Sequence, residues 1–302
     1  MWPTGAGPNG KIGLAVSGGP DSLAMLLLAH GSMPRTIEAA TVDHGLRPEA
    51  AAEAAHVAQI CAEMGVPHQI FRVNVAAGNV QDEARNARYA ALAAWATDRN
   101  LAAIATARHA EDQAETMVMR LNRGSGLSGL TGIRQQTTVP GSHIPLLRPL
   151  LGWRRQELAE VVEGVGIAPV HDPSNLDMRF DRVKMRQHLA RAEWIDPLAL
   201  AASARHLADA EDALAWAVTQ EWDRCVRQEG AAWRYRPAAP RAIRLRVVTQ
   251  ILEQMGGNPR GSAVARLVDA LDSGEGGPLA GALARVDNQD WVFAPEPGRR
   301  QR

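Results

Sequence analysis

The sequence predicts an α/β protein in which a parallel sheet carries helices on both faces and a smaller helical domain follows. Two observations lead to this prediction. Strand-like and helix-like segments alternate along residues 11–122 at the spacing of βαβ units. After about residue 195 the strand signal disappears, and long alanine- and leucine-rich stretches follow. We therefore expect one domain over residues 1–195 and a second, mainly helical domain over residues 196–302.

The predicted elements follow one another in a regular order. Strands are expected at 11–17, 36–43, 68–75 and 101–109, and helices at 21–30, 48–65, 80–100 and 110–122. A glycine-rich loop at 122–133 precedes an extended segment and a helix within 145–166, and then come helices at 196–229 and 239–255 and a small hairpin at 277–297. Right-handed crossovers place the carboxyl ends of the parallel strands at one edge of the sheet, which is where ligands bind.

Composition limits the class of protein. The chain has 302 residues, is 46% hydrophobic and has no net formal charge, which suits globular domains with a substantial core. Zero net charge disfavours a uniformly basic nucleic-acid binder but allows local basic patches. No apolar run approaches the roughly 20 residues of a membrane span, and the N-terminus lacks the pattern of a signal peptide. The isolated Cys61 and Cys225 indicate a reducing compartment, so we expect a cytoplasmic protein.

The segment SGGPDS at 17–22 lies between the first strand and the first helix. A tight loop that enters a helix presents unpaired backbone N–H groups and the positive end of the helix dipole, which together bind anions. Glycines allow a phosphate to approach the backbone closely. Asp21 fits such a site if Mg²⁺ lies between its carboxylate and the phosphates. The loop has neither the GxxxxGK[ST] nor the GxGxxG pattern. A glycine turn in which Asp21 or Ser22 caps the helix is the alternative.

Polar residues follow two further strands of the predicted sheet. Asp43 and His44 end the second strand, where Asp43 could also serve as a turn residue. His109 precedes a helix on which Asp112 and Glu115 are one turn apart and face the same way. Helix capping alone explains acids at this position, but it does not require the histidine. The sheet edge is therefore expected to carry a polar, charged site.

Basic residues also occur with a regular spacing. Arg85 and Arg88 are three residues apart on one face of a long helix, either as a functional pair or as a solvated charged surface.

The same motifs occur together in a known family. The segments are SGGPDSLAML (17–26), VDHGLR (42–47), EARNARYAAL (83–92), HAEDQAETMVMRLNRGSGLSGLTGI (109–133), RPLL (148–151) and DPSNLD (172–177). In this order they resemble the bacterial tRNA(Ile)-lysidine synthases, which belong to the Rossmann-like PP-loop ATP pyrophosphatases, and the resemblance covers residues 11 to about 190. It implies ATP and Mg²⁺ as cofactors, and L-lysine and tRNA(Ile) with a CAU anticodon as partners. In that reaction C2 of the wobble cytidine is adenylated with release of pyrophosphate, and the lysine amine then displaces AMP.

The resemblance also implies roles for individual residues. The loop residues expected to bind the ATP phosphates are Ser17, Gly18, Gly19, Pro20, Asp21 and Ser22, with Asp43 and His44 in a nucleotide or lysine pocket. The residues expected to carry the chemistry are Asp21, His109, Asp112, Glu115 and Arg120, and Asp21 and Asp112 are the expected metal ligands. An amine nucleophile is attracted as a cation and then deprotonated, which suits carboxylates beside a histidine.

Basic segments outside these motifs are candidates for tRNA contacts. The segment RFDRVKMRQHL (179–189) departs from the family sequence but stays basic, and WRYRPAAPRAIRLR (233–246) combines five arginines and two aromatic residues with no acid. The alternative for the second segment is solvated arginines with aromatic rings in the core. The candidate tRNA-binding residues are Arg85, Arg88, Arg123, Arg182, Arg186, Arg234 and Arg236. The glycine-rich loop at 122–133 either covers the reactive base or is a plain linker.

Two other functions remain open at this point. A tRNA thiolase of the same superfamily needs cysteines for sulfur transfer or for an iron–sulfur cluster, and Cys61 and Cys225 are isolated. A nucleotide-binding module without catalysis would leave the cluster at 109–115 unexplained. The sequence does not distinguish a monomer from a homodimer.

Overall fold

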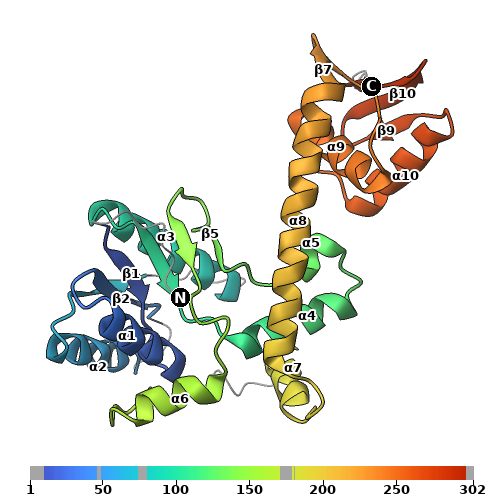
Figure 1. The fold of residues 1–302 in the computed structure, drawn as a ribbon. Helices are drawn as coiled ribbons and strands as arrows, with labels where there is room; N and C mark the ends of the chain where they lie inside the picture. The colour runs from blue at the N-terminus through green and yellow to red at the C-terminus, as the bar shows by residue number, and fades with distance from the viewer. Residues whose placement is uncertain (1–9, 46–48, 74–79, 171–178, 180, 297–302) are drawn as a thin grey trace. The chain divides into compact units, whose positions relative to one another are not determined.

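The computed structural model describes residues 10–45, 49–73, 80–170, 179 and 181–296 (Figure 1). The chain divides into two compact units, Met1–Ala208 and Asp209–Arg302. The division falls beyond the expected boundary at 195/196 because one long helix, α8 (Pro197–Cys225), runs through that region. The DPSNLD motif at 172–177 and the end of the VDHGLR motif lie outside the described residues.

The first unit contains a six-stranded sheet in the order β3-β2-β1-β4-β6-β5. Its strands are β1 (Ile12–Ala15), β2 (Ile37–Asp43), β3 (His68–Arg72), β4 (Ala103–Thr106), β5 (Gln136–Thr138) and β6 (Pro145–Leu147). All neighbours are parallel except β5 and β6, which pair antiparallel. The predicted parallel sheet is therefore confirmed, with one antiparallel edge strand that the sequence did not reveal.

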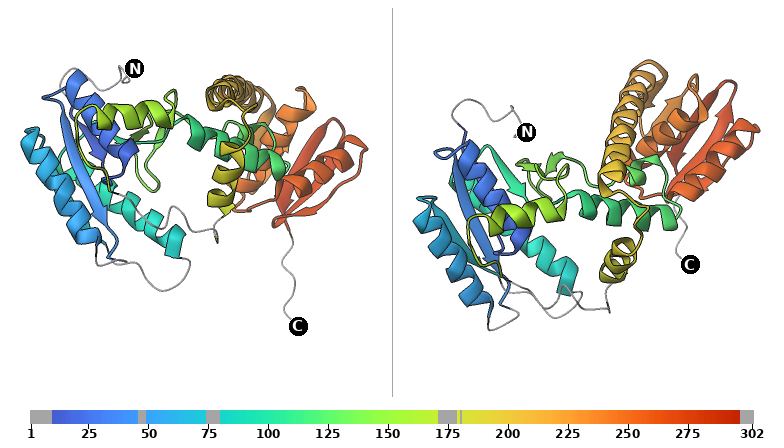
Figure 2. Two further views of the ribbon diagram at one scale, coloured as in Figure 1. Left: turned by 90° about the horizontal axis from the view of Figure 1, so that it is seen from below. Right: turned by 60° about the horizontal axis from the view of Figure 1, so that its bottom comes forward.

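Helices cover both faces of this sheet, as predicted (Figures 1 and 2). The helices of the first unit, besides the start of α8, are α1 (Pro20–Ser32), α2 (Ala50–Glu63), α3 (Val80–Asp98), α4 (Ala110–Asn122), α5 (Leu127–Leu130), α6 (Arg155–Glu163) and α7 (Asp181–Ala190). Leu26 of α1, Val57 of α2 and Leu158 of α6 share one apolar core. Trp95 of α3 lies in a second core on the opposite face. A Cβ at Gly13 of β1 would come within 2.6 Å of the Trp95 ring, so α3 packs directly on the strand backbone.

The second unit combines helices with a five-stranded antiparallel sheet in the order β7-β8-β11-β10-β9. Its remaining elements are α9 (Arg241–Gln254), α10 (Gly261–Asp272), β7 (Val226–Glu229), β8 (Ala232–Tyr235), β9 (Gly277–Leu279), β10 (Ala282–Asp287) and β11 (Asp290–Pro295). Val248 and Val268 of the helices pack with Tyr235 and Phe293 of the sheet. The second unit thus contains helices, as predicted, and its sheet extends well beyond the predicted hairpin. Among the described helices, none has the length and apolar character that a membrane span requires.

Candidate active site at the carboxyl edge of the parallel sheet

Two serine hydroxyls brace the loop between β1 and α1. The backbone N–H of Ser17 donates to Ser22 Oγ at 3.1 Å, and Ser22 Oγ donates to the Gly19 carbonyl at 3.0 Å. The two hydroxyl oxygens are 3.2 Å apart. Ser22 is buried and its hydrogen-bonding capacity is used within the loop, whereas Ser17 is exposed. The structure thus places Ser22, a predicted phosphate ligand, as a brace that fixes the shape of the turn.

The two glycines of this loop have different reasons to be glycine. Gly18 has a φ of 86°, and a Cβ there would lie 3.0 Å from Val170 and 3.1 Å from Val57, so the fold itself requires it. Gly19 has an ordinary φ of −70°, and the nearest atom to its missing Cβ is the Ser17 hydroxyl at 3.8 Å. The open space above Gly19 at the N-terminus of α1 suits an anion that approaches the backbone.

Pro20 starts helix α1 at its first position. It has no N–H group, so it fixes the helix geometry but cannot donate a hydrogen bond to a phosphate.

His109 lies between carboxylates from the start of α1 and from α4. Its Nδ1 is 2.9 Å from Glu111 Oε2, and its Nε2 is 3.5 Å from Asp21 Oδ2 and 3.7 Å from Asp112 Oδ2. Burial opposes a charge on His109, but the hydrogen bonds to Asp21 and Glu111 and the charge of Asp112 outweigh burial and raise its pKa to about 9. At neutral pH this histidine is therefore an imidazolium in the structure described here.

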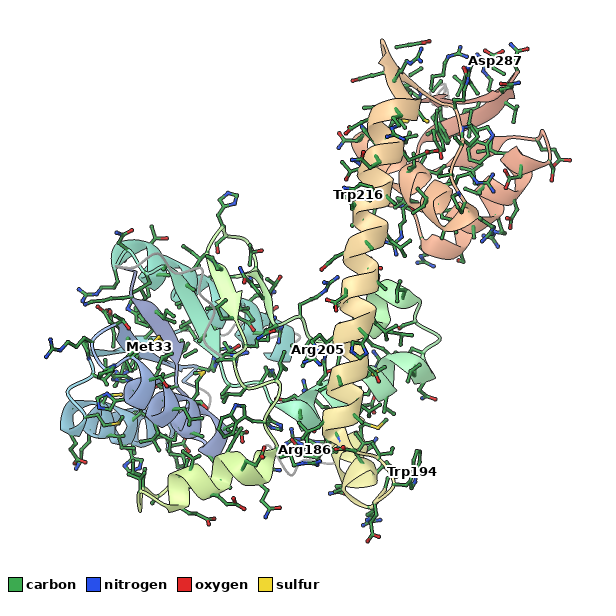
Figure 3. All side chains as sticks on the ribbon, in the orientation of Figure 1. Met33, Arg186, Trp194, Arg205, Trp216 and Asp287 are labelled. Atoms are coloured by element: carbon green, nitrogen blue, oxygen red, sulfur yellow. The ribbon has the colours of Figure 1, made fainter. Side chains whose placement is uncertain are left out.

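Two arginines from α7 cover the acidic pair of α4. Arg182 bonds both acids, with its Nη2 2.7 Å from Asp112 Oδ1 and its Nε 2.8 Å from Glu115 Oε2. Arg186, labelled in Figure 3, donates from Nε to Glu115 Oε1 at 2.7 Å. Asp112 and Glu115 are buried, whereas the two arginines are partly exposed, so the arginines cover a buried acidic pair. The structure brings the predicted acids together and pairs them with Arg182 and Arg186, whose role in tRNA binding stays a prediction.

Asp112 also accepts bonds on the side facing β4. Arg108 Nη1 lies 3.0 Å from its Oδ1, and the backbone N–H of His109 lies 3.3 Å from its Oδ2. Although burial raises the pKa of Asp112, the positive charges of Arg108, His109 and Arg182 prevail and lower it. With both oxygens already engaged, the structure gives no support to Asp112 as a metal ligand.

Asp21 remains a good candidate for binding Mg²⁺. Its Oδ2 faces His109, while its Oδ1 is buried and has no hydrogen-bond partner in the structure. No group of three His, Cys, Asp or Glu side chains among the described residues forms a metal site. Mg²⁺ usually takes only one or two carboxylates and fills its other positions with water and phosphate oxygens. The residues present fit a metal shared between Asp21 and a bound nucleotide.

The end of β2 favours the alternative in which Asp43 is a turn residue. Asp43 Oδ1 accepts the N–H of Gly45 at 2.8 Å, so this aspartate stabilises a turn. His44, the next residue, is half-buried, and its Nδ1 has no partner. Burial, together with the charge of Arg88, lowers the pKa of His44. The structure therefore places His44 beside the basic residues of α3.

Arg120 holds the glycine-rich loop rather than the site. Its guanidinium donates to the carbonyls of Gly129 and Gly132, and Gln113 bonds the loop at Ile133 and Thr131. The predicted catalytic role of Arg120 thus has no support in this geometry. The loop at 122–133 contains the short helix α5 and is tied to α4. Arg123 at the exposed end of α4 stays a predicted tRNA contact.

The arginines of residues 233–246 are mostly neutralised. Arg234 lies 3.1 Å from Asp287 and 3.2 Å from Asp290, and Arg236 lies 2.7 Å from Asp290. The remaining arginines pair as Arg241 with Asp269, Arg244 with Asp272 and Arg246 with Glu211. Tyr235 is fully buried in the core. Arg234 and Arg236 therefore lie in a surface of ion pairs, and their role in tRNA binding stays a prediction.

Sequence reasoning missed two residues of the site, Arg108, which bonds Asp112, and Glu111. Glu111 Oε2 holds His109 and also accepts the backbone N–H of Arg155 at 3.0 Å, which links α4 to the start of α6. The only sign of Glu111 in the sequence is an acid two residues after a histidine at the start of a helix. An acid in that position is usually explained by its favourable interaction with the helix dipole.

A phosphate-binding loop and an acidic cluster at the carboxyl edge of a parallel sheet define a nucleotide-dependent enzyme of the PP-loop class. Residues 5–193 match the PP-loop domain family, so the chain belongs to that class, which uses ATP.

Curated relatives identify the particular family. The chain is 48% identical to the tRNA(Ile)-lysidine synthase of Novosphingobium aromaticivorans, over 97% of this chain and 91% of that protein. It is 44% identical to the tRNA(Ile)-lysidine synthase of Zymomonas mobilis, over the same shares of the two chains. The chain belongs to the tRNA(Ile)-lysidine synthase family.

A solved structure shares the fold alone. It is the U34-tRNA thiolase NcsA from Methanococcus maripaludis with its [4Fe-4S] cluster, with a TM-score of 0.57 and 16% identity over 67% of this chain and 73% of that one. Burial raises the pKa of the Cys61 thiol to about 11, and burial and the nearby Glu221 raise that of Cys225. Neither cysteine is an activated thiolate, which disfavours sulfur-transfer chemistry here.

Proposed function

We propose that this chain adenylates the wobble cytidine of tRNA(Ile) with a CAU anticodon and joins L-lysine to C2 of that base. Its membership in the tRNA(Ile)-lysidine synthase family supports the reaction. The observation that supports the site is the meeting of Asp21 in the phosphate-binding loop with His109 of the acidic cluster, 3.5 Å apart.

The reaction has two steps. In the first, the C2 oxygen of cytosine attacks the α-phosphorus of ATP, an O–P bond forms and the bond to pyrophosphate breaks. In the second, the lysine amine attacks C2, an N–C bond forms and the C–O bond to AMP breaks. The ammonium group must lose a proton before it attacks.

The loop stabilises the negative charge that develops on the leaving pyrophosphate. Backbone N–H groups at Gly18 and Gly19 and the N-terminus of α1 provide fixed donors for phosphate oxygens. When bound, Mg²⁺ supplies positive charge beside the phosphates, and Asp21 Oδ1 is the atom available to hold it.

Asp112 and Glu115 provide the buried negative charge that attracts the lysine ammonium. Since Arg182 and Arg186 occupy these carboxylates, an ammonium group that enters must replace a guanidinium. His109 is already protonated at neutral pH, so it acts as a positioning residue for Asp21 rather than as the proton acceptor.

The test is transfer of labelled lysine to RNA. The protein is incubated with ATP, radiolabelled L-lysine and a tRNA(Ile) transcript with a CAU anticodon, and RNA-bound label and released AMP are measured. The control transcript carries uridine at the wobble position. Equal labelling of both transcripts, or AMP release without labelling, would contradict the proposal.

A further inference from the structure

Four arginines gather around one tyrosine at the carboxyl edge of the parallel sheet. The guanidinium carbons of Arg85 and Arg88 lie 5.0 and 5.3 Å from the centre of the Tyr89 ring. Arg148, which follows β6, and Arg108, which follows β4, lie close enough to lower the pKa of the Tyr89 hydroxyl through their charges. Arg148 also donates from Nη1 to the backbone carbonyl of Arg134 at 2.6 Å. We call Arg85, Arg88, Arg108 and Arg148 the arginine cluster.

The arginine cluster lies on the α3 face of the sheet. Side chains alternate between the faces of a strand. Leu147 of β6 packs in the core beneath α1, so Arg148 points to the α3 face, where Leu146 and Trp95 pack. The phosphate-binding loop, by contrast, leads into α1 on the other face. The phosphate-binding loop and the arginines of α3, together with Arg148, share one edge of the sheet but face opposite sides of it. Arg108, which bonds Asp112, links the two groups.

The positive charge of this cluster is not neutralised by the described residues. Among them, no carboxylate lies within ion-pair distance of Arg85, Arg88 or Arg148, and only Arg108 has one, Asp112. Burial lowers the pKa of Arg88, and the neighbouring Arg108 and Arg85 lower it further. Tyr89 holds two guanidinium groups by its ring face, which leaves their N–H groups available to a ligand. The arginines of α7 and of residues 233–246 differ, since they are paired with acids.

Two polar atoms nearby also lack partners. His44 Nδ1 and Thr106 Oγ1 are buried and make no hydrogen bond with any of the described residues. His44 is close to Arg88, whose charge lowers its pKa after the larger effect of burial. Thr106 follows Ala105, which packs under α1, so the threonine points to the α3 face. Buried polar atoms are nearly always paired in folded proteins, and a ligand with phosphate oxygens would supply acceptors here.

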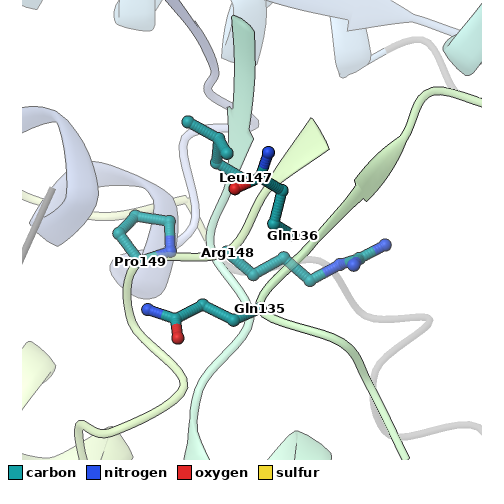
Figure 4. A pocket seen from close by; sticks show the side chains of 5 residues that line it. All are labelled: Gln135, Gln136, Leu147, Arg148 and Pro149. Carbon is teal, nitrogen blue, oxygen red and sulfur yellow. The ribbon is translucent and has the colours of Figure 1, made fainter. Parts of the chain in front are cut away.

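Arg148 also borders a hollow in the surface. This cavity has a volume of about 190 Å³ and is lined by Gln135, Gln136, Leu147, Arg148 and Pro149 (Figure 4). Figure 4 shows the Arg148 and Gln135 side chains pointing away from each other. Amide and guanidinium groups therefore continue the polar surface beyond the cluster.

We propose that the arginine cluster binds the phosphodiester backbone of the tRNA anticodon loop next to the reactive base. Guanidinium groups bind phosphate oxygens in a bidentate manner, and neutralised phosphates supply most of the affinity of RNA-binding proteins. This inference rests on the proposed function, since it assumes that the substrate is a tRNA. The ATP polyphosphate is the other source of phosphate oxygens, and its expected position at the loop on the opposite face of the sheet favours RNA.

The experiment measures two affinities in the full-length protein. Dissociation constants for the CAU tRNA(Ile) transcript and for ATP are determined for wild type, Arg85→Gln, Arg88→Gln and Arg148→Gln over a series of salt concentrations. Arg35→Gln is the matched control, because Arg35 is an exposed arginine just before β2, at the opposite edge of the sheet. Thermal unfolding verifies that each variant is folded. Arg85 is exposed, so its substitution leaves the core intact if the more buried Arg88 cannot be replaced.

The expected result is a rise of about 10-fold in the tRNA dissociation constant for each cluster variant, with ATP affinity within about 2-fold of wild type. The slope of log affinity against log salt falls by about one per arginine. Unchanged tRNA affinity in folded variants, or loss of ATP affinity alone, would overturn the inference. In that case the proposed function still stands if wild type transfers lysine to the tRNA, and it fails separately if wild type does not.

Discussion

His109 Nε2 lies 3.5 Å from Asp21 Oδ2, and this contact joins the loop after β1 to the helix after β4. The two residues come from distant parts of the sequence and meet because β1 and β4 are parallel neighbours with a common carboxyl edge. The state of one group therefore affects the other: the carboxylate keeps the histidine charged, and the histidine fixes one oxygen of the carboxylate.

Asp21→Asn is expected to reduce lysidine formation by about 100-fold or more, because the loop loses the only charged atom available for Mg²⁺. The pKa of His109 is expected to fall below its present value of about 9, since a charged acceptor is removed. Single-turnover lysine transfer and NMR titration of the histidine measure the two effects. Asp98→Asn, at the exposed end of α3, is the control. Normal turnover in Asp21→Asn would disprove its role.

Folding stability is expected to fall as the pH rises from neutral to about 10. The pKa of His109 is about 9 in the folded protein and 6.5 ordinarily, so the folded state binds this proton more tightly. This contribution is complete below about pH 6.5 and is lost as pH rises through 9, with a total of about 3 kcal/mol. Urea unfolding at a series of pH values measures it. His109→Gln is expected to remove the pH dependence in this range, and an unchanged slope in that variant would assign the effect to other groups.

Alanine substitutions at the two loop glycines are expected to separate folding from ligand binding. Gly18→Ala should destabilise the first unit by roughly 1–2 kcal/mol, because it combines a positive φ with contacts at 3.0 and 3.1 Å. Gly19→Ala should leave stability nearly unchanged but weaken ATP binding, since the added methyl group enters only the open space above the loop. Urea unfolding and ATP titration are compared for both. The reverse pattern would show that the nucleotide binds elsewhere.

The contributions of Glu115 and Arg186 to folding stability are expected to be strongly coupled. Glu115→Gln removes the negative charge that faces two guanidinium groups, and the cost in free energy of unfolding is expected to be about 3 kcal/mol. The double variant Glu115→Gln/Arg186→Gln should cost less than the sum of the single ones. Chemical unfolding of the four proteins of this cycle measures the coupling. Strict additivity would mean that the ion network contributes little to stability.

Much of the first unit could be predicted because its strands and helices have strong local patterns. Helix α4 covers 110–122, as its sequence predicts. Helix α7 was missed because none of its residues is buried, and ion pairs to α4 hold it instead of an apolar face. In the second unit, β7 follows α8 without a break, and β7 and β8 have only four residues each. Such short strands give too few alternations to be recognised.

Most residues of the site could be predicted from the sequence, but the ion pairs that they form could not. The spacing of Asp112 and Glu115 placed them on one helix face, and the structure agrees. That Arg182 and Arg186 cover them depends on contacts between residues far apart in the sequence, which local patterns do not encode. In the same way, the acids that neutralise Arg234 and Arg236 belong to β10 and β11, outside the basic segment itself.

The separation of charge across the edge of the parallel sheet bears on inhibition. Carboxylates collect at Asp21 of α1 and Asp112 of α4, whereas Arg88 and Arg148, which have no carboxylate partner among the described residues, lie on the α3 side. A cationic mimic of the amino acid would therefore bind near the carboxylates, and a polyanionic mimic of the nucleic acid would bind near the guanidinium groups. Two such inhibitors can bind at the same time. A single compound that carries both a cationic and a polyanionic group would have to extend across the end of the sheet to reach both sites.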